Sequence, residues 1–157
     1  MILDERTELA DAVSVAAAAS TFNVGDVIDT SVVRDLGNGR TVYLVVNVDT
    51  EIITGGTAGT IQFQLVSDSV ATPATDGTQT IHAISEEFVT DDAAANDSEL
   101  NAGGRPFVIA LPLEGPEYER YLGLQAIVGT TTITAGNVNA FLTLDPSGWK
   151  AHADGAN

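Results

Sequence analysis

The stretch that decides the fold class reads TVYLVVNVD at residues 41–49, IITGGTAG at 52–59 and TIQFQLVS at 60–67. β-Branched and aromatic residues dominate the outer two runs and glycines gather between them, which is the pattern of two strands joined by a turn. Because successive side chains of a strand point to opposite faces, one face of the first run carries Val42, Leu44, Val46 and Val48, and one face of the second carries Ile61, Phe63 and Leu65, opposite Gln62 and Gln64. We expect an antiparallel hairpin whose apolar faces build the core.

The rest of the chain repeats this pattern in short apolar runs separated by turn residues. It predicts extended segments at residues 12–22, 27–33, 79–85, 105–113, 120–128 and 137–144, with loops at 68–80 and 86–104. Strands without intervening helices argue against a parallel α/β sheet. The expected fold class is therefore all-β, an antiparallel jelly roll or β-sandwich of about eight strands, with a barrel as the remaining alternative.

Length and charge narrow the possible partners. At 157 residues the chain suits one domain, which we place at 1–157 with an N-terminal arm or helical turn at 1–11 and a C-terminal tail at 146–157. It carries 22 acidic and 6 basic residues, and a net charge of −16 argues against nucleic acid or an anionic membrane as a partner. Neither a signal peptide nor a run of roughly 20 apolar residues is evident, so we expect assembly in a cytoplasm.

The sequence offers little chemistry. It has no cysteine, and its two histidines, His82 and His152, have no neighbour at metal-ligand spacing. No Gly-x-Ser-x-Gly elbow is present. We therefore expect that the protein is not an enzyme and needs no cofactor. One alternative is calcium held by the acidic loop through Asp91, Asp92, Asn96, Asp97 and Glu99, although their spacing does not match an EF-hand.

The C-terminal strands resemble a known family. The segments RYLGL at 120–124, TTTITAG at 130–136 and AFLTLD at 140–145 are similar, in this order, to the capsid cement proteins of tailed bacteriophages, also called head decoration proteins and known from a Bordetella short-tailed phage. MILD at 1–4, AST at 19–21, RDLG at 34–37 and YLVV at 43–46 agree as well. The resemblance spans most of the chain, except the acidic loop 86–104, and rests on the order of strand and turn patterns.

This resemblance implies a structural role. A family member of this kind is a small jelly roll on the outer face of an icosahedral head, where it stabilises contacts between subunits of the major capsid protein. The implied partners are that capsid protein and further copies of the chain, as a homodimer or homotrimer, and the implied location is the outer surface of the virion. The alternative from another class is a carbohydrate-binding or tail-associated β-sandwich module, possibly calcium-dependent.

Three apolar residues have no place in the strand pattern and are candidate contacts with the capsid or with another subunit. They are Ile2 and Leu3 in the arm and Trp149 in the tail. Exposed tryptophan is favoured as an interface anchor, whereas the competing interpretation is that Trp149 folds back to close one end of the domain.

Overall fold

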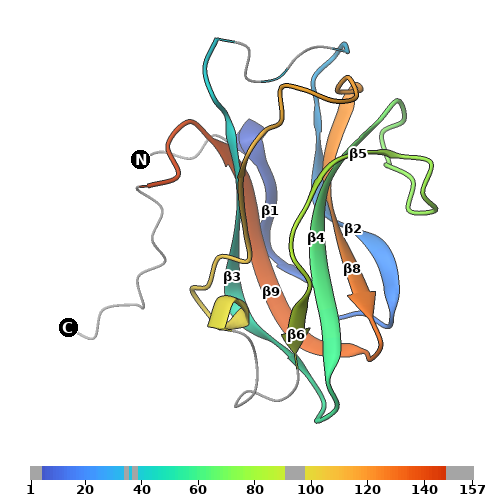
Figure 1. The fold of residues 1–157 in the computed structure, drawn as a ribbon, viewed down its shortest axis with the longest axis vertical. Coiled ribbons are helices and arrows are strands. Elements are labelled where there is room, and N and C mark those ends of the chain that lie inside the picture. Colours follow the sequence, from blue (N-terminus) through green and yellow to red (C-terminus); the bar gives the residue numbers. More distant parts are fainter. Residues whose placement is uncertain (1–4, 34–35, 37–38, 91–97, 148–157) are drawn as a thin grey trace.

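The protein is described by a computed structural model that covers residues 5–33, 36, 39–90 and 98–147. Within these residues it has two single-turn 3₁₀ helices and nine strands (Figure 1). The helices are η1 (Glu5–Thr7) and η2 (Ser98–Leu100), and the strands are β1 (Glu8–Ser14), β2 (Ser20–Asp29), β3 (Tyr43–Thr54), β4 (Gly59–Asp68), β5 (Thr80–Ile84), β6 (Phe88–Thr90), β7 (Phe107–Ala110), β8 (Tyr121–Gly129) and β9 (Ile133–Thr143). The predicted all-β class is confirmed.

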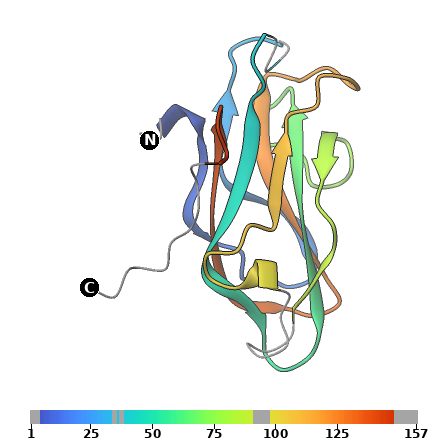
Figure 2. The ribbon, with the colours of Figure 1, turned by 60° about the vertical axis from the view of Figure 1, so that its left-hand side comes forward.

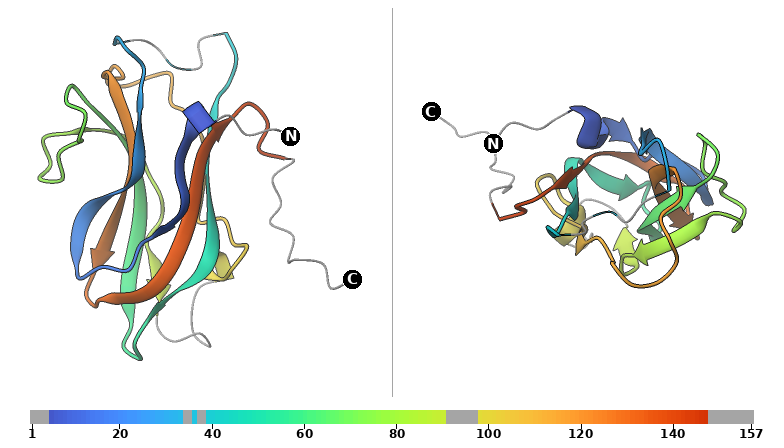
Figure 3. Two further views of the ribbon diagram at one scale, coloured as in Figure 1. Left: turned by 180° about the vertical axis from the view of Figure 1, so that it is seen from behind. Right: turned by 90° about the horizontal axis from the view of Figure 1, so that it is seen from above.

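The strands form two antiparallel sheets packed face to face (Figure 3). The first sheet has the order β1-β9-β3-β7, and the second has the order β2-β8-β4-β5, with β6 pairing β4 beyond the end of β5. Apart from the run β4-β5-β6, each connection carries the chain from one sheet to the other. Since β5 and β6 share one edge, the nine strands fill eight positions, and this order is a jelly roll.

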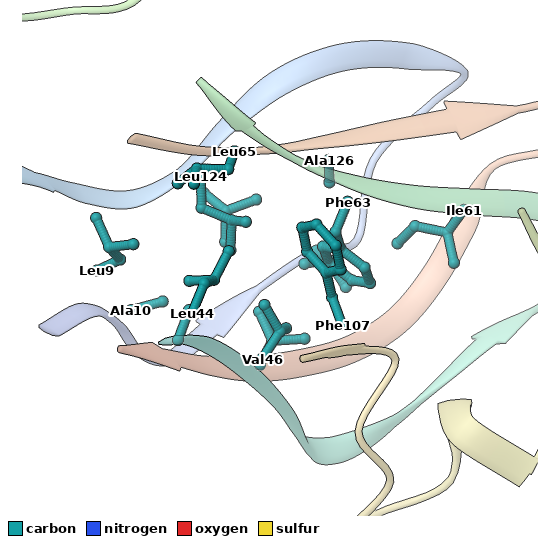
Figure 4. Packing of buried hydrophobic residues seen from close by; sticks show 14 of the residues in the cluster. Leu9, Ala10, Leu44, Val46, Ile61, Phe63, Leu65, Phe107, Leu124 and Ala126 are labelled. Atoms are coloured by element: carbon teal, nitrogen blue, oxygen red, sulfur yellow. The ribbon is translucent and has the colours of Figure 1, made fainter. Parts of the chain in front are cut away.

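The core lies between the sheets (Figure 4). Leu44 and Val46 of β3 point toward Phe63 and Leu65 of β4 across the gap, and all four side chains are fully buried. In β8 the same period-2 rule predicts that Leu122, Leu124, Ala126 and Val128 share the inward face, and all four are buried. The period-2 rule therefore identified the inward faces of these three apolar runs.

The predicted hairpin of residues 41–67 is wrong, because β3 and β4 lie in different sheets. β3 pairs with β7 and β9, whereas β4 pairs with β5, β6 and β8. The glycine-rich turn after β3 carries the chain across the core. In a hairpin both apolar faces would lie on the same side of one sheet, whereas here they face and bury each other.

Three other boundaries also differ from the prediction. The arm at 1–11 ends early, since β1 begins at Glu8 and buries Leu9 and Ala10. The loop at 86–104 contains β6 and η2, which bury Phe88 and Leu100. The strand predicted at 137–144 is β9 and begins at Ile133.

Glycines inside strands explain the remaining shifts. Gly25 has φ +69° within β2 and Gly136 has φ +142° within β9. The register of β2 against β8 shifts between Val24 and Ile28, so β2 runs over Ser20–Asp29 and not over 27–33 as predicted. A glycine in an apolar run marks a bulge as readily as a turn.

The β4–β5 loop, as predicted, has no regular structure, but it covers the outer face of the second sheet. Gln125 of β8 is fully buried beneath it. The Gln125 side chain accepts hydrogen bonds from Gln64 (2.7 Å) and Gln79 (3.1 Å) and donates to Asn23 (2.9 Å) and to the carbonyl of Ala74 (2.7 Å). This network explains why Gln64, predicted on the outward face, is buried: a buried amide is stable when its hydrogen bonds are made.

Candidate interaction surfaces

The three contact candidates predicted from sequence, Ile2, Leu3 and Trp149, lie outside the described residues. So do His152 and four of the five oxygen donors of the calcium alternative, of which the structure describes only Glu99. Among the residues the structure describes, no three His, Cys, Asp or Glu side chains are placed to hold a metal ion. Ile2, Leu3 and Trp149 therefore stay predicted contact residues.

His82 takes part in the contact that most resembles catalytic chemistry. Its Nε2 lies 2.7 Å from Ser67 Oγ, and its ring stacks on Tyr118 with the centroids 3.9 Å apart. Serine beside histidine is the pairing of an activated nucleophile. Ser67, however, is fully buried, and its Oγ accepts the backbone N–H of Glu119 at 3.0 Å. These contacts have a structural role, because they hold β4, β5 and the β7–β8 loop together.

Burial lowers the pKa of His82 below its ordinary value of 6.5, and the negative charge of nearby Glu119 opposes that shift. The unfolded chain therefore binds this proton first as the pH falls. The stability that the neutral ring contributes is complete above about pH 6.5 and is lost as the pH falls through the lower pKa of the folded state.

The contacts of His82 predict that the stability of the protein depends on pH. Between pH 7 and pH 5 the urea midpoint of the wild type should fall more steeply than that of His82→Gln, because glutamine cannot take up the proton. His152→Gln is the matched control and should keep the wild-type slope. Equal slopes for the wild type and His82→Gln would show that His82 does not titrate as its surroundings require.

An ion pair fixes the end of β2 against β8. Arg120 donates from Nε to Asp29 Oδ1 and from a terminal nitrogen to Oδ2, both at 2.8 Å, and its guanidinium lies over the Tyr121 ring. The hydrogen bonds from Arg120 lower the pKa of Asp29 to about 2. Both side chains are more than 40% exposed, so the pair orders this corner and adds little to overall stability.

A shallow polar cleft lies between η1, β1 and β2. Carboxylates dominate its lining, which consists of Glu5, Arg6, Glu8, Asp26, Val27, Ile28 and Asp29. Asp29 is paired with Arg120, and the other carboxylates make this cleft an acidic part of the surface.

Exposed aliphatic side chains gather in two places. Strands β2, β4, β7 and β9 all finish at the same end of the sandwich, which we call the loop end (Figure 3). Beyond these strand ends lie exposed Val32, Val33, Val70, Leu113 and Leu144. The second group consists of Ile81 and Ile84 of β5 and Val89 of β6, whereas Val108 of β7 is exposed on an edge of the other sheet. Isolated exposed aliphatics are ordinary, but groups of them mark interaction surfaces.

The comparisons with known proteins identify the family. The model of the Bbp16 family, a family of Bordetella phage proteins, matches residues 9–142. The chain belongs to the Bbp16 family. The matched Bbp16 region runs from β1 into β9 and so includes all but the ends of the jelly roll. A search of curated proteins found no match.

Membership of the Bbp16 family confirms the phage part of the sequence-based interpretation. It also agrees with the resemblance seen in the C-terminal strands. No helix in the described part of this Bbp16 protein is long and apolar enough to cross a membrane.

Proposed function

We infer that the protein is a capsid cement protein, which binds the outer surface of the phage head and stabilises contacts between major capsid subunits. The observation that carries this inference is the match of residues 9–142 to a phage protein family. A protein that joins neighbouring subunits must resist being deformed. A two-sheet sandwich with a continuous core suits that demand, because packed interiors transmit strain.

The distribution of exposed aliphatic residues supports the same role. A protein that joins two subunits needs at least two contact surfaces on one rigid body, and the loop end and the β5–β6 edge supply two. The carbohydrate-binding alternative is less well supported, because sugar sites commonly expose aromatic rings. Every Phe and Tyr side chain in the described ranges is buried or half-buried.

The charge of the protein bears on how it would reach the head. At a net charge of −16 it is attracted to basic patches on a shell and repelled by other copies in solution. At physiological ionic strength, salt screens exposed charges that are more than about 8 Å apart. Added salt should therefore slow association with the head more than it speeds dissociation of a complex held by apolar side chains.

The proposed function predicts re-attachment to heads that lack the protein. Purified full-length chain, added to heads of its own phage assembled without it, should co-sediment to saturation. Raising salt from 0.05 to 0.5 M should slow attachment on the order of tenfold and change release much less.

Heads that already carry the protein are the control and should take up no more. Failure to co-sediment at any salt concentration would contradict the proposed function. An attachment rate that does not change with salt concentration would show instead that the acidic surface serves only solubility. Trp149→Ser, compared in the same assay, tests the predicted anchor in the tail.

A further inference from the structure

The two sheets have four edges, of which one is shared by β5 and β6, and the other three are guarded against pairing with another chain. β1 carries Glu8 and Asp11, with Ala12 in a bulge at φ +47°. β2 carries Asp26 and bulges at Gly25. Charges and bulges on an edge are the usual means of preventing strand addition.

The remaining two edges, β7 and β5, come into view in Figure 2. β7 is four residues long and lies between Pro106 and Pro112, which limit pairing because proline has no N–H to donate. β5 reads TIHAI and contains no Asp, Glu, Lys, Arg or Pro, and its histidine, His82, contacts Ser67 and Tyr118. It pairs with β4 on one side, and no strand in the described part of the chain pairs with its other side. β5 is therefore the unguarded edge.

The backbone of β5 is oriented for a further strand at Ile84. The N–H of Ser85 donates to the carbonyl of Phe63 in β4 at 2.8 Å. In an antiparallel ladder consecutive residues alternate between bonding inward and outward. The N–H and C=O of Ile84 therefore point away from β4, toward the open side.

A bulge gives this edge an apolar side-chain strip. Ile84 is opposite Gln64 and Ile81 is opposite Val66, with a register shift between them at His82–Ala83. Without that extra residue, Ile81 and Ile84 would face opposite sides, because three positions is an odd number. Farther along, Val89 of β6 is opposite Thr60. Ile81, Ile84 and Val89 are thus opposite Val66, Gln64 and Thr60 of β4 and share the outer face, and they are 45%, 50% and 46% exposed.

The charges beside the apolar strip indicate which kind of segment can pair with β5. Glu86 and Glu87 follow β5 and are exposed, and Glu119 accepts the Thr80 hydroxyl at 2.7 Å at the start of the strand. If a second copy paired antiparallel along β5, the glutamates of one copy would approach Glu119 of the other. Like charges across an interface are unfavourable, so the edge fits a segment that brings Lys or Arg at its ends.

Building on the proposed function, we propose that β5 receives an extended segment of the major capsid protein as an added strand. The segment bonds the outward N–H and C=O of Ile84. It packs the apolar side chains of one of its faces on Ile81, Ile84 and Val89, and its basic residues lie near Glu86 and Glu87. Main-chain bonds supply affinity in this mode of recognition, and the alternate side chains supply specificity.

Two variants separate the backbone from the side chains. Ile84→Pro removes the outward N–H together with the isoleucine side chain, at a position where an edge strand tolerates proline, so any loss beyond that of a side-chain variant measures the backbone bond. Ile84→Thr keeps a β-branched residue and shortens the apolar strip. The matched control is Val108→Thr on β7, which is 42% exposed on an edge of the other sheet. Folding is checked by circular dichroism and the melting temperature, and binding by co-sedimentation with heads that lack the protein.

We expect Ile84→Pro to weaken attachment to heads at least tenfold, Ile84→Thr severalfold and Val108→Thr not at all. Should Ile84→Pro fail to fold, the comparison of Ile84→Thr with Val108→Thr decides. If both Ile84 variants bind heads as tightly as the wild type, this inference is wrong and the proposed function stands. If the wild type itself does not bind, both are wrong. Sedimentation of the free protein that shows a dimer dissociated by Ile84→Pro would assign the edge to a second copy and overturn the proposal.

Discussion

Replacing Leu124 with aspartate should abolish folding. Leu124 is 1% exposed in the central strand β8, where it pairs with Val24 on one side and Leu65 on the other. Truncating a buried leucine costs about 2–5 kcal/mol, and an unpaired carboxylate in the core adds several more. The total is comparable with the whole stability of a domain, about 5–15 kcal/mol. Circular dichroism and proteolysis of the purified variant measure the result.

The control for this substitution is Leu113→Asp, because Leu113 is 66% exposed at the loop end. It introduces the same charge and should leave the melting temperature within a few degrees of the wild type. A Leu124→Asp variant with a wild-type melting temperature would mean that β8 does not face the core as described.

Replacing Gly25 with alanine should cost roughly 2–5 kcal/mol of stability. At φ +69° an L-residue is strained by about 1–2 kcal/mol. An added Cβ would also lie 2.0 Å from the carbonyl oxygen of Leu9, and overpacking of this kind costs about 1–3 kcal/mol. The β1 and β2 backbones can approach this closely only because residue 25 has no side chain. Urea unfolding followed by circular dichroism gives the difference.

Gly56→Ala separates the two contributions. Gly56 also has a positive φ, +87°, but an added Cβ would have no atom within 4 Å. This variant should lose only the backbone part, about 1–2 kcal/mol. If Gly25→Ala and Gly56→Ala lose the same amount, the close contact between Gly25 and Leu9 does not constrain the fold.

Local pattern predicted the fold class and the inward faces, but not which strands pair. In the runs around Leu44, Phe63 and Leu124 every second residue is apolar over three or more positions, so the inward faces could be identified without a structure. Pairing depends on contacts between residues far apart in the chain, and a glycine-rich turn suits a hairpin and a crossing between sheets equally well. The error at residues 41–67 follows directly.

Irregular strands were also missed. Leu9 belongs to a strand that carries Glu8 and Asp11, and charges on an edge strand look like a solvated arm. Gly25 and Gly136 lie within β2 and β9 where the register against a neighbouring strand shifts, whereas the sequence pattern places each of them between two predicted strands. A bulge changes which residues share a face, and sequence alternation alone cannot detect this change.

The same limit applies to the interaction surfaces. Sequence reasoning identified Ile2, Leu3 and Trp149 because they fell outside the strand pattern, and these residues lie outside the described part of the structure. It did not identify the β5 edge, where Ile81 and Ile84 share a face only through the bulge between them. One signal in the sequence was the absence of charge from TIHAI in a chain so rich in acidic residues.

A reconstruction of the phage head by electron cryo-microscopy tests the central claim most directly. Heads that carry the protein should show density on the outer surface, absent from heads that lack it, across junctions between capsomers. The two-sheet sandwich should fit this density with the β5 edge against a capsid subunit. Identical maps, or added density only inside the shell or on the tail, would contradict the account.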